Sequence, residues 1–289
     1  MKKILLIIVF VLCWFGVYSQ NFNEGFSEYA DLSKFTVIDS AYMKCTYKLT
    51  YVKDTLKQSE KSTDMQILLV GKTVSKYYSQ YKLDYHNFVA KLMKDDSEDG
   101  IPRIKEDGAW SYELFKNYPA GKETVTDIES MLRQSFYYEE DMPKLNWQMG
   151  NEQQTVLGYP CQKATVRFRG RDYTAWFAMS IPVMNGPWKF GGLPGLILKL
   201  YDSKEQFVYE CIGLENLKQK EPIKYYKVDC TKTTRLGLAK QYERWHADLA
   251  AYEYTVFGRE VSYYYRKTGK LEHRRNGSPP IPYNPIELE

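Results

Sequence analysis

The chain has 289 residues, of which 44% are hydrophobic and 26% are charged, and its formal net charge at pH 7 is +4. This length is enough for one large domain or two small ones. The nearly balanced charge includes no block of Lys or Arg, so nucleic acid is not expected as a partner.

The first 19 residues have the layout of a secretory signal peptide. Lys2 and Lys3 precede an apolar run over residues 4–17, and Ser19 and Gln20 follow it. The run is too short to span a bilayer comfortably, so we expect cleavage near Ser19 and export to the periplasm or the outer cell envelope. No second long apolar run follows, so no transmembrane segment is expected after signal removal. The alternative is an uncleaved amino-terminal helix that acts as an anchor.

Signal removal takes away Cys13 and leaves Cys45, Cys161, Cys211 and Cys230. An even number of cysteines in an oxidising compartment predicts one or two disulfides. Four cysteines allow three full pairings, and the sequence does not choose between them. The alternative is buried free thiols, because a core of this size does not need covalent links.

The mature chain begins with segments that alternate in the manner of β-strands. A short helix or arm is expected over residues 21–34, and alternation with a period of two predicts a strand over 40–54. Residues 64–79 predict two strands joined by a turn at Gly71 and Lys72.

A helix is predicted over residues 81–93, because apolar side chains recur there at helical spacing. These side chains are Tyr81, Tyr85, Phe88 and Leu92. Further strands are predicted at 107–118, 123–130, 133–140 and 144–150. A hairpin then follows, with strands at 162–168 and 173–179 and a turn at 169–172.

A glycine-rich stretch follows the hairpin. Leu193-Pro194-Gly195-Leu196 fits a type II turn, in which Pro194 presets φ and Gly195 supplies a positive φ. The turn would lead directly into a strand over 196–201. A phosphate-binding loop is not indicated, because Gly195 is followed by Leu-Ile-Leu and not by Lys-Ser/Thr at a helix start.

The last third of the chain predicts one more strand, one helix and a tail. The strand covers residues 205–217, and the helix begins at a Thr233 or Thr234 cap and runs to about Tyr252. The tail at 276–289 contains four prolines and is expected to be extended or disordered.

Long successive strands with few helices predict a mainly β (α+β) fold. We expect a curved antiparallel sheet or half-open barrel, with a few helices on one side, in a single domain over residues 20–275. The 26 Tyr, 13 Phe and 6 Trp residues suit half-buried strands. Aromatic side chains facing inward on a curved sheet could line an apolar cavity. The alternative is a solid core that the rings fill.

The segment Gly192-Leu-Pro-Gly-Leu-Ile197 resembles the hexapeptide that names the GLPGLI family, a group of exported proteins from Bacteroidetes-type bacteria. The resemblance extends over residues 147–202. It includes Gly158-Tyr-Pro-Cys-Gln-Lys-Ala164, Gly170-Arg171, Ala175-Trp176-Phe177, Ile181-Pro182, Gly186-Pro-Trp-Lys-Phe190 and Asp202, in the order that the family shows. The resemblance implies an exported domain of this type, but the family has no established biochemical role and supplies no catalytic residue.

The order of strand, Ile181-Pro182, loop, Gly-Leu-Pro-Gly and strand is also similar to the half-open barrels of LolA-type periplasmic lipoprotein carriers. This is an analogy of fold, which by itself carries no function.

Residues that could support catalysis are few. His86 is expected to face solvent, His246 to be packed or half-exposed, and His273 to lie in a basic tail segment. No pair of histidines has metal-ligand spacing, and no Gly-x-Ser-x-Gly motif occurs. The acidic clusters at 95–99 and 139–141 are expected at solvated edges. The sequence therefore predicts neither an enzyme nor a bound metal or cofactor.

The preferred functional hypothesis is a non-enzymatic envelope protein that binds an apolar small molecule, a lipid or a protein segment in its sheet concavity. A loop at the rim would make the contacts, with Trp188 and Phe190 in the lead. Its proposed members are Gly186, Pro187, Trp188, Phe190, Gly192, Leu193, Pro194 and Gly195. One alternative is a structural or interaction partner of outer-membrane proteins that uses a sheet edge. The other is a hydrolase whose site the sequence does not reveal.

Overall fold

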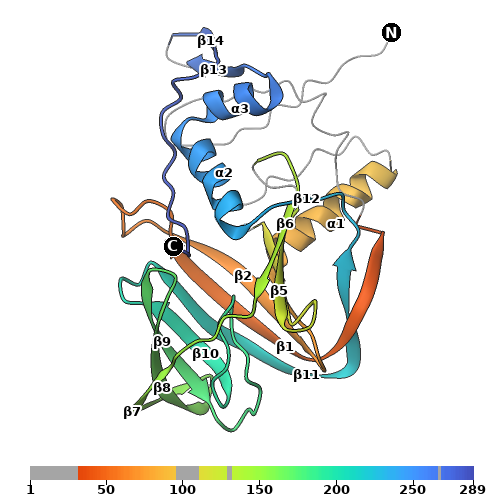
Figure 1. Cartoon of the computed structure of the whole chain (residues 1–289), viewed down its shortest axis with the longest axis vertical. Coiled ribbons are helices and arrows are strands. Elements are labelled where there is room, and N and C mark those ends of the chain that lie inside the picture. Colours follow the sequence, from red (N-terminus) through yellow and green to blue (C-terminus); the bar gives the residue numbers. More distant parts are fainter. Residues whose placement is uncertain (1–31, 96–110, 129–131, 266–267) are drawn as a thin grey trace.

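The computed structural model describes residues 32–95, 111–128, 132–265 and 268–289. In this part of the chain, strands form a 12-stranded sheet and a separate two-stranded hairpin, and three helices accompany them (Figure 1). The predicted signal peptide at 1–19 lies outside the described residues, as does nearly all of the arm expected at 21–34.

Two long strands, β1 (Phe35–Val52) and β11 (Phe207–Tyr226), pair at the centre of the large sheet. Beyond β1 the order continues with β2 (Lys61–Gly71), β3 (Ser75–Ser79), β4 (Tyr112–Lys116), β5 (Lys122–Asp127), β6 (Phe136–Asp141) and β12 (Thr231–Lys232). Beyond β11 it continues with β10 (Leu196–Asp202), β9 (Arg171–Ala178), β8 (Tyr159–Phe168) and β7 (Gln148–Val156). β12 pairs parallel with β6, and the other described neighbours in this sheet are antiparallel.

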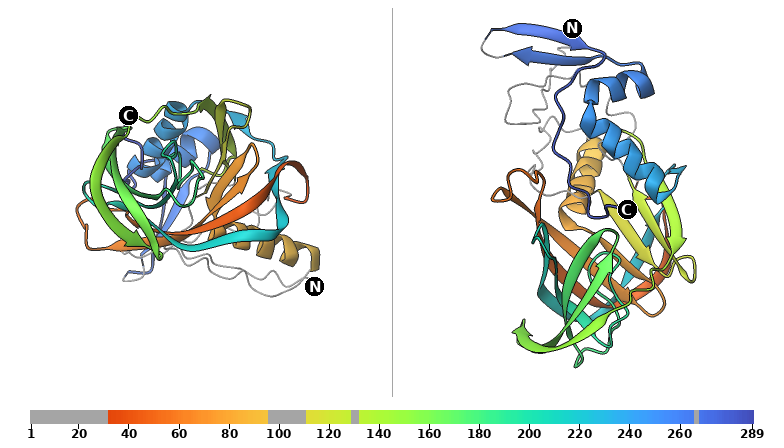
Figure 2. Two further views of the ribbon diagram at one scale, coloured as in Figure 1. Left: turned by 90° about the horizontal axis from the view of Figure 1, so that it is seen from below. Right: turned by 60° about the vertical axis from the view of Figure 1, so that its left-hand side comes forward.

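Irregular pairing bends the centre of the sheet. The register between β1 and β11 shifts at residues 37–39, 41–43 and 46–47 of β1, and such bulges increase the local twist of a strand. Seen from below, the sheet curves around an interior (Figure 2). Its end strands β7 and β12 do not pair with each other in the described residues, so the sheet stays open. The expected mainly β fold with a curved antiparallel sheet is confirmed.

Side chains alternate between two faces of the sheet. In β2, Leu68 belongs to the large core on the concave side, whereas Ile67 belongs to a smaller core on the convex side. Helix α1 (Gln80–Asp95) lies against β2 and β3 on the convex side, where it covers the smaller core. Helix α2 (Arg235–Ala247) adds Leu238 to the large core, so the helices lie on different faces of the sheet.

The single helix expected to end near Tyr252 is two helices. The hydroxyl of Thr234 caps α2 by accepting a hydrogen bond from the amide of Gly237 at 3.0 Å. Asp248 then adopts an extended backbone and caps α3 (Leu249–Phe257), because its carboxylate accepts from the amide of Ala251 at 3.0 Å. Among the described residues, no helix combines the length and apolar character that a membrane crossing requires.

The expected type II turn at residues 193–196 is wrong in its geometry. The amide of Gly195 donates to the carbonyl of Leu193 at 2.8 Å, which closes a three-residue turn around Pro194. The positive φ in this stretch belongs to Gly192, at 81°. Gly195 is required for a different reason: a Cβ there would overlap the carbonyl oxygen of Ala178. The strand that the turn leads into is confirmed as β10.

Candidate functional site

The loop over residues 179–195 fills the concave side of the sheet instead of forming a rim around a hollow. Trp188 is 3% exposed and Phe190 is 0% exposed. The ring of Phe190 lies 4.6 Å from that of Tyr173 and 5.4 Å from that of Phe168, centroid to centroid. Of the eight residues proposed as rim contacts, only Gly192 and Pro194 are exposed. The apolar side chains of the expected rim, Trp188, Phe190 and Leu193, thus belong to the core, and ligand contact by this loop stays a prediction.

A buried ammonium group holds this loop in place. Lys116 on β4 donates from Nζ to the side-chain oxygen of Asn185 and to the carbonyls of Gly186 and Phe190, each at 2.9 Å. Its cross-strand neighbour on β5 is Glu123, which is also buried. Burial lowers the pKa of Lys116 and raises that of Glu123. Nothing in the sequence pattern indicated this lysine as a binding partner of the loop.

The chain's last residues run past α2 to the end of the large sheet nearest that helix, and we call this end the mouth (Figure 1). We call residues 281–289 the C-terminal segment, and its contacts begin at α2. The amide of Ile281 donates to the carbonyl of His246 at 2.7 Å. The ring of Tyr283 stacks on the His246 ring, with centroids 4.4 Å apart. Burial lowers the pKa of His246 to about 4, against the opposing effect of nearby backbone carbonyls.

An arginine on β9 recognises the Asn-Pro pair of the C-terminal segment. Nη2 of Arg171 donates to the side-chain oxygen of Asn284 at 2.6 Å and to the carbonyl of Pro285 at 2.8 Å. Nη1 of the same guanidinium bonds Asp202 and Gln206, at 3.2 and 2.9 Å. The side-chain Nδ2 of Asn284 in turn donates to the carbonyl of Val52 at 2.8 Å. Arg171 is buried; the Nη1 bonds anchor its guanidinium to Asp202 and Gln206, and the Nη2 bonds hold the segment.

The next two residues of the segment enter the core. Ile286 is 8% exposed, and its carbonyl accepts from the hydroxyl of Tyr173 at 3.2 Å. The carboxylate of Glu287 accepts from Nε1 of Trp188 at 3.0 Å and pairs with Nζ of Lys189 at 2.8 Å. The buried loop and the C-terminal segment therefore hold each other.

Lys189 lies at the centre of an ionic cluster. Its side chain is 0% exposed, and it also bonds Glu140 at 2.5 Å and the hydroxyl of Tyr138 at 3.1 Å. Burial alone would lower the pKa of Lys189, but Tyr138 and the two glutamates outweigh it and raise the pKa. Two further cations, Arg169 and Arg235, lie within 4 Å of the same two carboxylates. We call the set that receives the segment the mouth site; it consists of Arg169, Arg171, Tyr173, Trp188, Lys189 and Arg235.

The segment ends on the same surface. The amide of Leu288 donates to the carbonyl of Arg169 at 2.9 Å, and Arg235 bonds the carbonyl of Glu289. The tail, expected to be extended or disordered, is thus extended and docked. Its apolar Ile281, Tyr283 and Ile286, each next to a proline, were the available signal for docking. Glu140 was expected at a solvated edge but lies in the ionic cluster with Lys189.

The cysteines do not form disulfides in the structure, which describes all four as free thiols. Cys45, Cys161 and Cys211 are buried, and Cys230 is half-buried. In the register of β1 with β11, Cys45 faces Leu214 while Cys211 faces Tyr47, so these two thiols occupy diagonal positions. Such positions are about 7–8 Å apart, farther than a disulfide allows. The register thus opposes a Cys45–Cys211 link, and the structure shows the alternative of free thiols at all four positions instead of the expected one or two disulfides.

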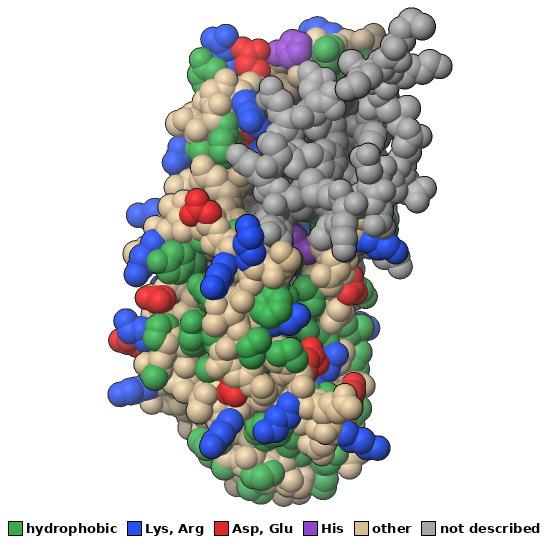
Figure 3. All heavy atoms as spheres, turned by 90° about the vertical axis from the view of Figure 1, so that its right-hand side faces the viewer, with side chains coloured by type: hydrophobic (Ala, Val, Ile, Leu, Met, Phe, Trp, Pro, Cys, Tyr) green, Lys and Arg blue, Asp and Glu red, His purple; other side chains and the backbone are tan. Residues whose placement is uncertain are grey.

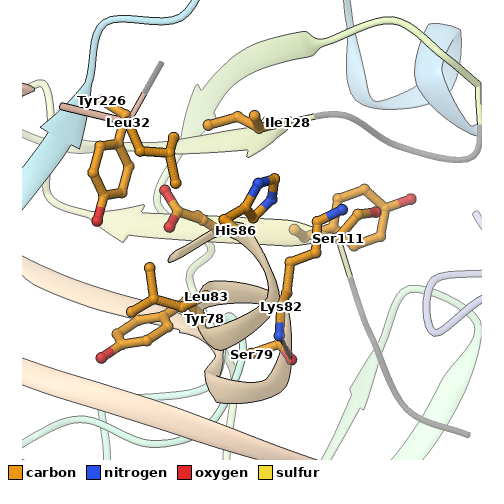
Figure 4. Close-up of a pocket in the computed structure, with 11 residues that line it drawn as sticks. Leu32, Tyr78, Ser79, Lys82, Leu83, His86, Ser111, Ile128 and Tyr226 are labelled. Carbon is orange, nitrogen blue, oxygen red and sulfur yellow. Dashed lines mark hydrogen bonds between the residues drawn. The ribbon is translucent and has the colours of Figure 1, made fainter. Parts of the chain in front are cut away.

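The histidines lie apart from one another. His86 was expected to face solvent, but it is buried, at 6% exposure. Its side chain points from α1 into a cavity of about 20 Å³ beside Ser79, Lys82 and Tyr226 (Figure 4). A cavity of this size holds about one water molecule. His246 is packed as expected, and His273 is exposed and bonds Ser262.

The described residues contain no group of three or more His, Cys, Asp or Glu side chains arranged to hold a metal ion. Much of the acidic run at 95–99 lies outside the described residues. On the face shown in Figure 3, Lys and Arg side chains are scattered among acidic and hydrophobic ones. The arrangement best suited to a ligand in the described part of the chain is thus the mouth site, and what it holds is extended polypeptide.

Comparison with known proteins gives a short sequence match and distant structural ones. Residues 168–199, from the end of β8 into β10, match a family model described as a protein of unknown function (Porph_ging). No curated protein matches the chain.

Two crystal forms of PNGF-II are similar to 68% and 70% of this chain, at 14% and 13% identity and a TM-score of 0.45 each. The match covers 32% of PNGF-II, so this chain spans about a third of its length. An uncharacterized conserved protein from Thermus thermophilus is similar over 67% of this chain and 90% of its own, at 10% identity and a TM-score of 0.33.

Proposed function

We propose that the protein is an exported, non-enzymatic protein of the periplasm or outer cell envelope that binds an extended polypeptide segment at the mouth of its curved sheet. The observation that carries this proposal is the C-terminal segment itself, which the mouth site already receives through Arg171, Tyr173, Trp188 and Lys189.

The chemistry of these contacts suits a peptide better than a lipid. The mouth site donates hydrogen bonds to the main-chain carbonyls of Pro285 and Ile286, and also to the side chains of Asn284 and Glu287. Main-chain bonds that supply affinity, together with side-chain contacts that supply specificity, are typical of recognition of extended peptides. An apolar small molecule or lipid is less well supported, because the loop side chains occupy the concave side.

Export and family membership are supported from the sequence. Residues 1–19 have the charged, apolar and polar regions of a signal peptide. Assignment to the GLPGLI family draws on the motifs between residues 147 and 202, and the Porph_ging match at 168–199 falls inside this stretch.

Crosslinking in living cells tests the proposal. Leu236 is 53% exposed in the first turn of α2, beside Arg235. A photoreactive residue at this position should crosslink to discrete envelope proteins, and the crosslinked site in each of them should fall within one short peptide. The matched control is Leu56, which is 92% exposed in the turn between β1 and β2. Equal capture from both positions, or capture from neither, would count against binding at the mouth.

The second candidate function is interaction with an outer-membrane protein through a sheet edge. β7 supports it, because this nine-residue strand pairs only with β8 among the described strands. A free strand edge can accept a strand from another chain. A photoreactive residue at Met149, which is 50% exposed on β7, should then capture partners that Leu236 does not.

A further inference from the structure

We propose that the mouth site is an exchangeable binding site for the sequence Asn-Pro-aliphatic-Glu, and that a second copy of this chain supplies that sequence. The inference rests on the proposed function, since it names the occupant of the same site. It treats residues 281–289 as a ligand that happens to be covalently attached.

Along the segment, Arg171, then Tyr173, and then Trp188 with Lys189 each bond a different position, so the site accepts the sequence in one register. Asn284 and the carbonyl of Pro285 meet Arg171. The carbonyl of Ile286 meets Tyr173, and the carboxylate of Glu287 meets Trp188 and Lys189. A shift of one residue would replace the carboxylate with an apolar side chain and leave buried donors without acceptors, which is unfavourable.

Charge also specifies the occupant. Without the segment, the cations of Lys189, Arg169 and Arg235 would share Glu140. Lys189 is completely buried, and breaking a buried ion pair strongly destabilises a protein. Any replacement must therefore bring a carboxylate at the position of Glu287. The same segment from a second copy meets this requirement with every contact unchanged.

The connection to the segment is suited to exchange between copies. Asp248 accepts from the amides of Gly277 and Ser278, at 2.6 and 3.0 Å, which fixes the chain just before the segment. Pro279 and Pro280 are exposed and provide an extended hinge. Exchange of an identical element between copies of a chain is a known route to dimers.

The first experiment tests recognition in trans. A specific protease site is inserted between the exposed Pro279 and Pro280, the folded chain is cut there, and a labelled peptide of residues 280–289 is added. We expect the peptide to bind and to displace the cut segment. Peptides with Glu287→Gln or Asn284→Ala should bind at least about tenfold more weakly, and a scrambled peptide should not bind. A cut chain that stays folded by circular dichroism but does not bind the peptide overturns the inference.

The second experiment uses the uncut chain, so it does not depend on the cut protein remaining folded. Two copies of the chain, made different in size, each carry a photoreactive residue at Leu288, which is 54% exposed. The control pair carries it instead at Leu271, which is 51% exposed on β14 (Lys270–Arg274). We expect crosslinks between copies from Leu288 only, increasing with protein concentration and suppressed by the free peptide.

Crosslinks confined to single chains at all concentrations overturn the role of a second copy. If the peptide still binds the cut chain, the partner that occupies the site is then a segment of a different protein. If the peptide fails as well but Leu236 captures partners in cells, the proposed function survives while this inference does not.

Discussion

At the scale of single residues, Lys189 joins the buried loop to the C-terminal segment. Replacement by Met removes the charge that Glu140 and Glu287 share, and we expect the free energy of unfolding to fall by about 3–5 kcal/mol. The matched control is Lys199→Met, which removes a half-exposed pair with Glu210 and should cost less than about 1 kcal/mol. Urea unfolding measures both. Equal losses of unfolding free energy in the two variants would show that the Lys189 cluster stabilises the protein no more than an exposed ion pair does.

The two glycines of the Gly-Leu-Pro-Gly stretch are needed for different reasons. Gly195→Ala would press a Cβ into the carbonyl oxygen of Ala178, which cannot rotate away, so we expect a loss of about 3 kcal/mol. Gly192→Ala meets nothing within 4 Å and incurs only the penalty of a positive φ, about 1 kcal/mol. Thermal unfolding of both variants measures the difference; a larger loss at Gly192 would refute this assignment. The sequence indicated that Gly195 matters, but not that the reason is contact with β9.

At the scale of elements, the docking of the C-terminal segment on α2 should depend on pH. The pKa of His246 in the folded protein is about 4, below its ordinary value of 6.5. The unfolded state therefore binds more protons between these values, so stability is complete above about pH 6.5 and is lost as the pH falls toward 4. The contribution is on the order of 3 kcal/mol.

His246→Gln should remove this dependence, whereas His273→Gln, at an exposed position on β14, should not. The measurement is urea unfolding at intervals from pH 7 to pH 4. A wild-type curve that runs parallel to that of the His246 variant would contradict the assignment.

Alternation and helical spacing predicted most elements correctly. The strand expected at 40–54 is β1, the hairpin of β8 and β9 is confirmed, and the helix expected at 81–93 is α1. The break between α2 and α3 was missed, because an Asp such as Asp248 does not by itself distinguish a helix interior from a cap. β7 was predicted only over its beginning, since its polar composition gives weak alternation.

At the scale of the whole molecule, the mouth site could not be predicted. It joins β9, the loop before β10, α2 and the last residues, which are distant in sequence, and tertiary packing alone brings them together. Local patterns identified the loop as special but assigned its aromatic side chains to a surface. The same limit applies to the cysteines, whose positions relative to one another depend on strand register.

The free state of the cysteines gives a prediction for the whole chain. A purified chain that starts at Gln20, and so lacks Cys13, should show four reactive thiols per molecule when denatured and titrated with a thiol reagent. A reductant should leave its melting temperature unchanged. Two thiols or none, together with a drop in melting temperature on reduction, would restore the disulfide interpretation.

The C-terminal segment occupies the mouth of the sheet as a docked extended ligand. Hydrogen–deuterium exchange of residues 280–289 in the intact chain tests it most directly, because the amides of Ile281 and Leu288 donate to His246 and Arg169. We predict exchange slowed on the order of 100-fold or more relative to the free peptide. Exchange at the rate of the free peptide would show that the segment is not docked at the mouth.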